Sequence, residues 1–170
     1  EDAINIIASN SKIKNLTVSK IKADAIDIDF GTLNFQNIIC KDISNDCLDA
    51  SGAKINGSYL QGENIKDKGL SFGENSVGKI TNIDFQNAKL GVAVKDGSRL
   101  ELSKYKLVNN RYDIAVFNKK NEYKGAFLNL EKSLEDNDLK FLIGFNNKFI
   151  KDNVDLENKI ANSKINQLFY

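Results

Sequence analysis

Charged side chains recur at matching positions of a repeated unit in this sequence. Stacking the repeats would align them in a charged strip, which is the candidate site for binding or catalysis. Carboxylates spaced in this way can ligate calcium through hard oxygen atoms, and a pair of them can act as acid and base on a sugar. The alternative is a charge ladder, in which opposite charges on neighbouring repeats stabilise stacking. The candidate binding residues of this charged strip are Asp46, Asp49, Lys66, Asp67, Lys68, Glu74, Lys95 and Asp96, with Asp27 and Asp29 in the same strip.

The repeat that aligns these residues has a period of 22. Its copies begin at Ile4, Ile26, Leu48, Leu70, Val92 and Ile114. Each copy holds three short apolar segments with spacings of two, which predict strands, and polar residues between them predict corners. In the fourth copy the inner segment starts one residue late, at Ile80, while the fifth copy still begins on schedule. We therefore expect one corner to gain a residue and the next to lose one.

Three short strands per turn predict an all-β fold, a single-stranded parallel β-helix of about six 22-residue coils with a C-terminal cap. We assign residues 1–130 to the β-helix and residues 131–170 to the cap. A leucine-rich repeat is the nearest rival because its period overlaps, but Ile21 stands where that repeat needs Asn or Cys. Within the cap, the sequence predicts a polar loop or short helical turn over 133–138, a hairpin over 141–150, and a further strand or irregular cap at the end.

Composition excludes several classes of function. Lys and Arg total 24 against 23 Asp and Glu, so no overall field favours nucleic acid or an anionic membrane. The absence of histidine excludes Ser-His-Asp and Cys-His arrangements within this chain. No apolar run is long enough to span a membrane. The two cysteines, Cys40 and Cys47, match no common metal motif, and we expect buried free thiols.

Three stretches carry a resemblance to a known family: DCLDASGA from Asp46, DKGLSFGENS from Asp67 and GVAVKDGS ending at Ser98. Residues 4 to about 130 resemble right-handed parallel β-helix proteins of the pectate-lyase-like superfamily, and more loosely β-helix modules of bacterial surface proteins. The resemblance implies a right-handed coil. That superfamily holds polysaccharide lyases, hydrolases and epimerases, and also adhesins and scaffolds without activity, so the fold does not choose among them.

The family's catalytic patterns fit this chain poorly. Pectate lyases pair calcium-binding acids with a catalytic Arg or Lys, and here Lys68 and Lys95 could imitate the base, but no Arg lies in the strip. Polygalacturonase-like enzymes need a His, which is absent. These departures count against enzymatic activity. We expect no resident cofactor, although the acids of the strip could ligate calcium.

The sequence thus favours a non-catalytic β-helix module of a secreted or cell-surface bacterial protein, serving as a scaffold or as a glycan-binding surface. The expected partner is a polysaccharide, with no nucleic acid and no membrane insertion, and the missing initiator Met suggests part of a larger polypeptide. Two alternatives stay open. One is a polysaccharide lyase or epimerase acting on acidic glycans through Asp46, Asp49, Lys68, Glu74 and Lys95. The other is a phage or virion fibre segment.

Overall fold

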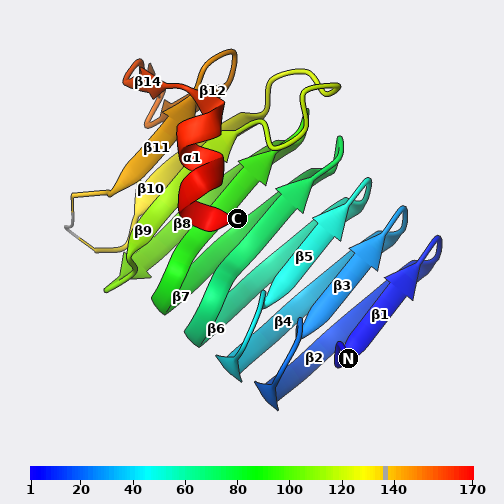
Figure 1. The fold of residues 1–170 in the computed structure, drawn as a ribbon. Coiled ribbons are helices and arrows are strands. Elements are labelled where there is room, and N and C mark those ends of the chain that lie inside the picture. The colour runs from blue at the N-terminus through cyan, green and yellow to red at the C-terminus, as the bar shows by residue number, and fades with distance from the viewer. Residues whose placement is uncertain (136–137) are drawn as a thin grey trace.

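Residues 1–135 and 138–170 are described by a computed structural model, which shows a parallel β-solenoid of about seven turns (Figure 1). The six repeat starts lie beside one another in register, from Ile4 through Ile26, Leu48, Leu70 and Val92 to Ile114. The predicted all-β solenoid and its 22-residue period are therefore confirmed. The solenoid has one turn more than predicted because parallel pairing continues past residue 130.

The elements follow the coils in order. They are β1 (Ile4–Ile7), β2 (Asn10–Ile21), β3 (Ile26–Asp29), β4 (Thr32–Ile43), β5 (Leu48–Ser51), β6 (Lys54–Gly73), β7 (Val77–Lys95), β8 (Arg99–Val108), β9 (Tyr112–Phe117), β10 (Phe127–Ser133), β11 (Phe141–Gly144), β12 (Lys148–Lys151), β13 (Val154–Asp155), β14 (Lys159–Ile160) and α1 (Asn162–Phe169).

These strands stack into two ladders that enclose one core. The first ladder, the starting face, contains β1, β3, β5, the ends of β6 and β7, and then β9 and β11. The second ladder contains β2, β4, the starts of β6 and β7, and then β8, β10 and β12. It bends twice in each coil, for example at Gln36, which pairs with no strand neighbour, and at Asp42, whose φ is +55°.

The core consists of stacked layers of inward-facing apolar side chains, and each coil contributes one layer. In the second coil Ile28, Leu33, Ile38 and Ile43 are fully buried. Each such side chain contributes about 1.5–3 kcal/mol relative to an exposed position. Because the same inward positions recur every 22 residues, stacking the coils makes this core continuous.

The one-residue slip expected in the fourth copy is present in the ladder between β6 and β7. Lys54 pairs with Val77, 23 residues later, whereas Leu70 pairs with Val92, 22 residues later. The extra residue enters at the corner of Glu74 and Asn75, both of which have positive φ. Corners absorb such changes because a slip within a strand would reverse every side chain.

The prediction of free thiols is wrong, because Cys40 and Cys47 form a disulfide with a Cα–Cα distance of 5.7 Å. Cys40 faces inward from β4, the chain then turns a corner, and Cys47 faces inward just before β5. Both cysteines are fully buried. A seven-residue separation around one corner therefore brings the two Cα atoms within disulfide range.

The C-terminal segment differs from the prediction in two respects. The predicted hairpin over 141–150 is wrong, because β11 pairs with β9 and β12 pairs with β10, as successive sides of one coil do. The antiparallel pair is β12 with β13 instead. The chain ends in α1, where the sequence suggested a strand or an irregular end. Of the predicted loop over 133–138, residues 136–137 lie outside the described residues.

Helix α1 lies across the starting face near the C-terminal end of the solenoid (Figure 1). Its buried residues, Ile165 and Phe169, pack against Leu90, Ala93 and Phe117. Those outward positions of the coils are apolar, so the helix covers surface that would otherwise meet water. Within the described residues, no helix has the length and apolar character needed to cross a membrane.

Candidate functional site

In the structure, the residues of the charged strip lie in several distinct environments. Asp46 belongs to a column of aspartates at the corner before the starting face. The backbone N–H of Asp24 donates to Asp2 (3.1 Å), that of Asp46 donates to Asp24 (2.7 Å), and that of Lys68 donates to Asp46 (2.9 Å). Each carboxylate thus satisfies the next coil's corner N–H group, which supplies a structural role for Asp46.

Lys68 closes this column in a buried ion-pair network. Its Nζ lies 3.5 Å from Asp46 Oδ1 and also donates to Asp67, whose other oxygen lies 3.3 Å from Lys89 Nζ. Burial raises the pKa of Asp46 to about 7, although Lys68 opposes the shift. Burial disfavours the charged form of Lys68, but Asp46, Tyr170 and Asp67 outweigh it and raise the Lys68 pKa. Lys68 therefore keeps its proton near neutral pH.

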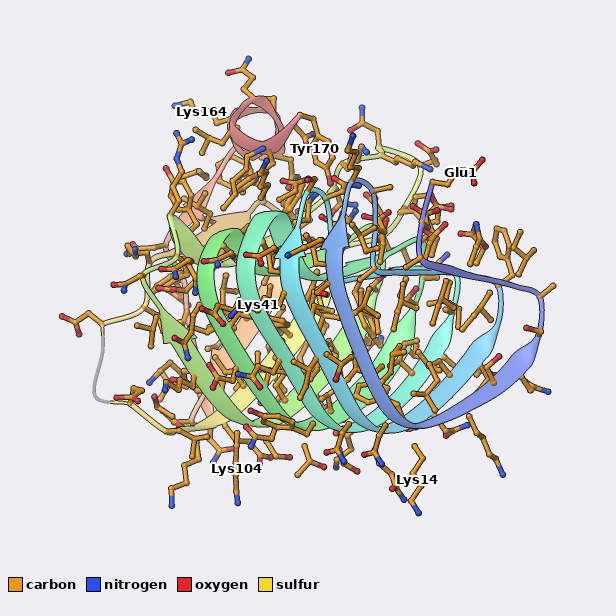
Figure 2. The ribbon with its side chains drawn as sticks, turned by 90° about the horizontal axis from the view of Figure 1, so that it is seen from below. Glu1, Lys14, Lys41, Lys104, Lys164 and Tyr170 are labelled. Atoms are coloured by element: carbon orange, nitrogen blue, oxygen red, sulfur yellow. A yellow bond between two sulfur atoms is a disulfide. The ribbon has the colours of Figure 1, made fainter. Side chains whose placement is uncertain are left out.

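Tyr170 follows α1 directly (Figure 2), and its ring lies beside Lys68 and Lys95 of the strip and beside Lys119. Its phenol oxygen accepts a hydrogen bond from Lys95 Nζ at 3.2 Å. The ammonium nitrogens of Lys119, Lys68 and Lys95 lie 3.8, 5.1 and 5.8 Å from the ring centroid. Cations at such distances from an aromatic ring are attracted by its quadrupole. Sequence reasoning missed Tyr170 because it lies 75 residues from Lys95 and joins the strip only through the unpredicted helix.

Lys95 donates a hydrogen bond to Tyr170 and is attracted by the Asp49 carboxylate. Burial disfavours its charged form, but Asp49 and Tyr170 raise its pKa above the usual value. Asp49 pairs in register with Ser71 on the next coil. Among the described residues, Asp49 Oδ1 and Ser71 Oγ are buried without a hydrogen-bond partner. The Asp49 carboxylate attracts the ammonium groups of both Lys95 and Lys119.

Glu74 and Asp96 anchor the long corner that joins β9 to β10. Glu74 pairs with Lys120. Asp96 Oδ1 accepts hydrogen bonds from the backbone N–H groups of Lys119 (2.7 Å) and Lys120 (2.8 Å). Asp96 is buried, so these bonds compensate for its loss of water. The two acids fix this corner.

The open part of the strip lies on the first coils and is acidic. Asp27 pairs in register with Asp49 on the next coil, and Asp29 lies two positions further along β3. Burial, followed by the charges of Asp29 and Asp49, raises the pKa of Asp27 to about 6. In the part of the chain that the structure describes, no three acidic or cysteine side chains are grouped as a metal ion requires.

Lys66 leaves the strip altogether and lines an open groove on the other side of the corner. This Lys66 groove has a volume of about 880 Å³ and follows the second bend of the coils. Its lining residues are Lys20, Ile21, Lys22, Asp42, Ser44, Asn64, Ile65, Lys66, Asn87, Ala88, Lys89, Asn109, Asn110 and Arg111.

A second groove follows the first bend of the coils. This Lys14 groove has a volume of about 560 Å³. It is lined by Lys12, Ile13, Lys14, Asn34, Phe35, Gln36, Asn56, Gly57, Ser58, Lys79 and Thr81. Lys14 lies at the edge of the solenoid opposite Tyr170 and α1 (Figure 2). The two grooves thus offer separate surfaces along the coil axis.

Comparison with known proteins finds no matching family, no matching curated protein and no matching solved structure for this chain.

Proposed function

We propose that this chain is a non-catalytic β-solenoid module of a secreted or cell-surface protein, which presents a rigid surface to glycans. One observation carries the proposal. The acids and lysines that acid–base chemistry would need are engaged in contacts that hold the coils, the helix and the long corner together. Two open grooves follow the stacked bends, and an extended polymer could lie along either of them.

The lysines of the strip are unsuited to proton abstraction. A general base works best with a pKa near the operating pH and within reach of its substrate. The pKa values of Lys68 and Lys95 are raised, and both side chains are buried. A lyase or epimerase would need one of them neutral and exposed. The geometry therefore supports binding over turnover.

The disulfide between Cys40 and Cys47 supports a location outside the reducing cytosol, because disulfides persist in oxidising compartments. Fully buried sulfur atoms at this corner cannot readily exchange with external thiols. A secreted or surface-exposed parent protein is the simplest setting for such a bond.

The proposal is tested by binding and turnover on one purified preparation. Immobilised acidic and neutral polysaccharides are assayed for retention of the chain, and the same polysaccharides are assayed for unsaturated or reducing ends. We expect retention without turnover. Turnover that disappears in Lys95→Ala would support the lyase or epimerase alternative, whereas lack of retention on every glycan would contradict glycan binding.

A further inference from the structure

We infer that the Lys66 groove binds an extended acidic glycan, with the polymer running along the coil axis and its anionic groups facing the basic column. The inference rests on the proposed function and adds a binding surface and a charge class of ligand to it. Lys20, Lys22, Lys66, Lys89 and Arg111 carry the positive charge of this groove.

The groove arises from a bend that repeats in the first five coils. Five residues at the bend have φ between 55° and 58°, namely Lys20, Asp42, Asn64, Asn87 and Asn109. Asparagine tolerates this left-handed region better than most residues. Side chains of the bend residues form one wall and those two positions later form the other, while buried residues such as Ile65 and Ala88 form the floor.

One wall of the groove is a basic column. It consists of Lys22, Ser44, Lys66, Lys89 and Arg111, so four of five successive coils supply a cation. Within the described residues, Lys22, Lys66 and Arg111 make no ion pair. Lys89 is partly neutralised by Asp67 at 3.3 Å. The column therefore presents unneutralised positive charge to solvent.

The opposite wall adds amide groups to this charge. Asn64 donates to Asp42 at 2.9 Å, and Asn87 donates to Asn64 at 3.2 Å. Among the described residues, Asp42 is the one acid that lines the groove, and its carboxylate accepts a hydrogen bond from Asn64. Amides can bond both hydroxyl and carboxylate groups of a sugar. The two walls together match a ligand that carries hydroxyl groups and negative charges.

The spacing of the groove favours a glycan over a nucleic acid. Adjacent coils lie about 4.8 Å apart, so the basic column extends for roughly 19 Å from the first coil to the fifth. The separation between adjacent coils is close to the length of one sugar unit in an extended polysaccharide chain. Single-stranded nucleic acids are held largely by stacking of bases on aromatic side chains, and none of the lining residues is aromatic.

The Lys66 groove is better suited to this ligand than the Lys14 groove. The Lys14 groove is lined by three lysines, and one of them, Lys79, lies 3.4 Å from Glu101. It extends over the first four coils and lacks a cation on the second and third. This difference provides a matched control, because two charges can be removed from either groove.

The test is calorimetric titration of the wild-type chain, K66Q/R111Q and the matched control K12Q/K14Q. The probes are a uronic-acid oligosaccharide, a sulfated oligosaccharide and a neutral oligosaccharide of equal length, and a single-stranded oligonucleotide. Equal Tm values for the three proteins establish that the folds are intact. We expect an acidic oligosaccharide to bind, and we expect K66Q/R111Q to weaken that binding by about tenfold or more because two cationic hydrogen-bond donors are removed. The control should retain wild-type affinity.

The outcomes separate this inference from the proposed function. Binding of glycans that is equal in wild type and K66Q/R111Q would overturn the Lys66 groove assignment and leave glycan binding standing. Equal affinity for neutral and acidic probes would overturn the charge class. Tighter binding of the oligonucleotide than of any oligosaccharide would overturn the assignment of a glycan ligand and indicate a nucleic acid instead. Absence of binding to every oligosaccharide would overturn the proposed function as well. The uronate and sulfate arms identify the source of the anionic group.

Discussion

Asp27 shows at the scale of one residue how the open acidic face affects stability. Its pKa is raised from 3.8 to about 6 by burial and by the charges of Asp29, Asp49, Asp2 and Asp24. The folded chain therefore holds this proton over a pH range in which the unfolded chain has lost it. Protonated Asp27 therefore contributes to the free energy of unfolding at pH values below the pKa of Asp27 in the unfolded chain. This contribution is lost as the pH rises from about 4 to about 6.

Replacing Asp27 with asparagine removes this titration. We expect D27N to have a Tm above that of wild type by a few degrees near pH 7, because one repelling charge is absent, and no such gain near pH 4. Thermal unfolding followed by circular dichroism at the two pH values measures the difference. E157Q removes an exposed carboxylate outside this face and serves as the control. A gain of equal size at both pH values would contradict the electrostatic explanation.

The Cys40–Cys47 disulfide is a second residue-scale feature with a measurable effect. It closes a loop with a sequence separation of seven. Loop-closure entropy predicts that C40A/C47A loses about 2–3 kcal/mol of unfolding free energy. Chemical denaturation of the two proteins measures the loss, and alkylation under denaturing, non-reducing conditions should modify no cysteine of the wild type. Two reactive thiols in that experiment would contradict the disulfide.

Individual contacts of the charged strip could not be predicted from the sequence, although its residue types could. Lys66 and Lys68 are two positions apart, yet the corner sends one into an open groove and the other into a buried network with Asp46. That separation depends on an irregularity of β6 between Ile65 and Lys68, where the register against β7 shifts. Tyr170 joins the strip across a large sequence distance, and no local pattern indicates such a contact.

Helix α1 is the element that the sequence analysis did not predict. It has eight residues, and only Ile165 and Phe169 are buried, so it lacks the long apolar periodicity that identifies a helix. The strands behave differently, because their inward residues recur in every coil and reinforce one pattern. Repetition thus made the coils predictable, while the single helix had no second copy to support its pattern.

Truncating Phe169 should release this helix from the coils. Phe-to-Ala changes in cores cost about 3–5 kcal/mol, and an isolated helix of this length is marginal in water. We expect the amides of α1 in F169A to exchange with solvent as fast as an unfolded segment, while those of β4 and β6 stay protected. Hydrogen–deuterium exchange mass spectrometry measures both. K164A changes an exposed position of the same helix and should preserve protection, and loss of protection throughout F169A would contradict independent docking.

At the scale of the whole molecule, charge is segregated around the solenoid even though the chain is nearly neutral, with a net charge of +1. Acidic residues gather on the open starting face of the first coils, and basic residues line the grooves along the two bends. Total charge therefore does not indicate which ligand a given face attracts. The local electrostatic field of each face determines that preference.

Backbone-amide NMR titration of the labelled chain with a uronic-acid oligosaccharide locates the glycan-binding surface residue by residue. If the Lys66 groove binds the glycan without turnover, we expect saturable shifts confined to the bend residues of successive coils, around 20–22, 42–44, 64–66, 87–89 and 109–111, and no chemical change in the sugar. Shifts centred on Lys68, Lys95 and Tyr170, accompanied by cleavage or epimerisation of the oligosaccharide, would contradict binding without turnover in the Lys66 groove.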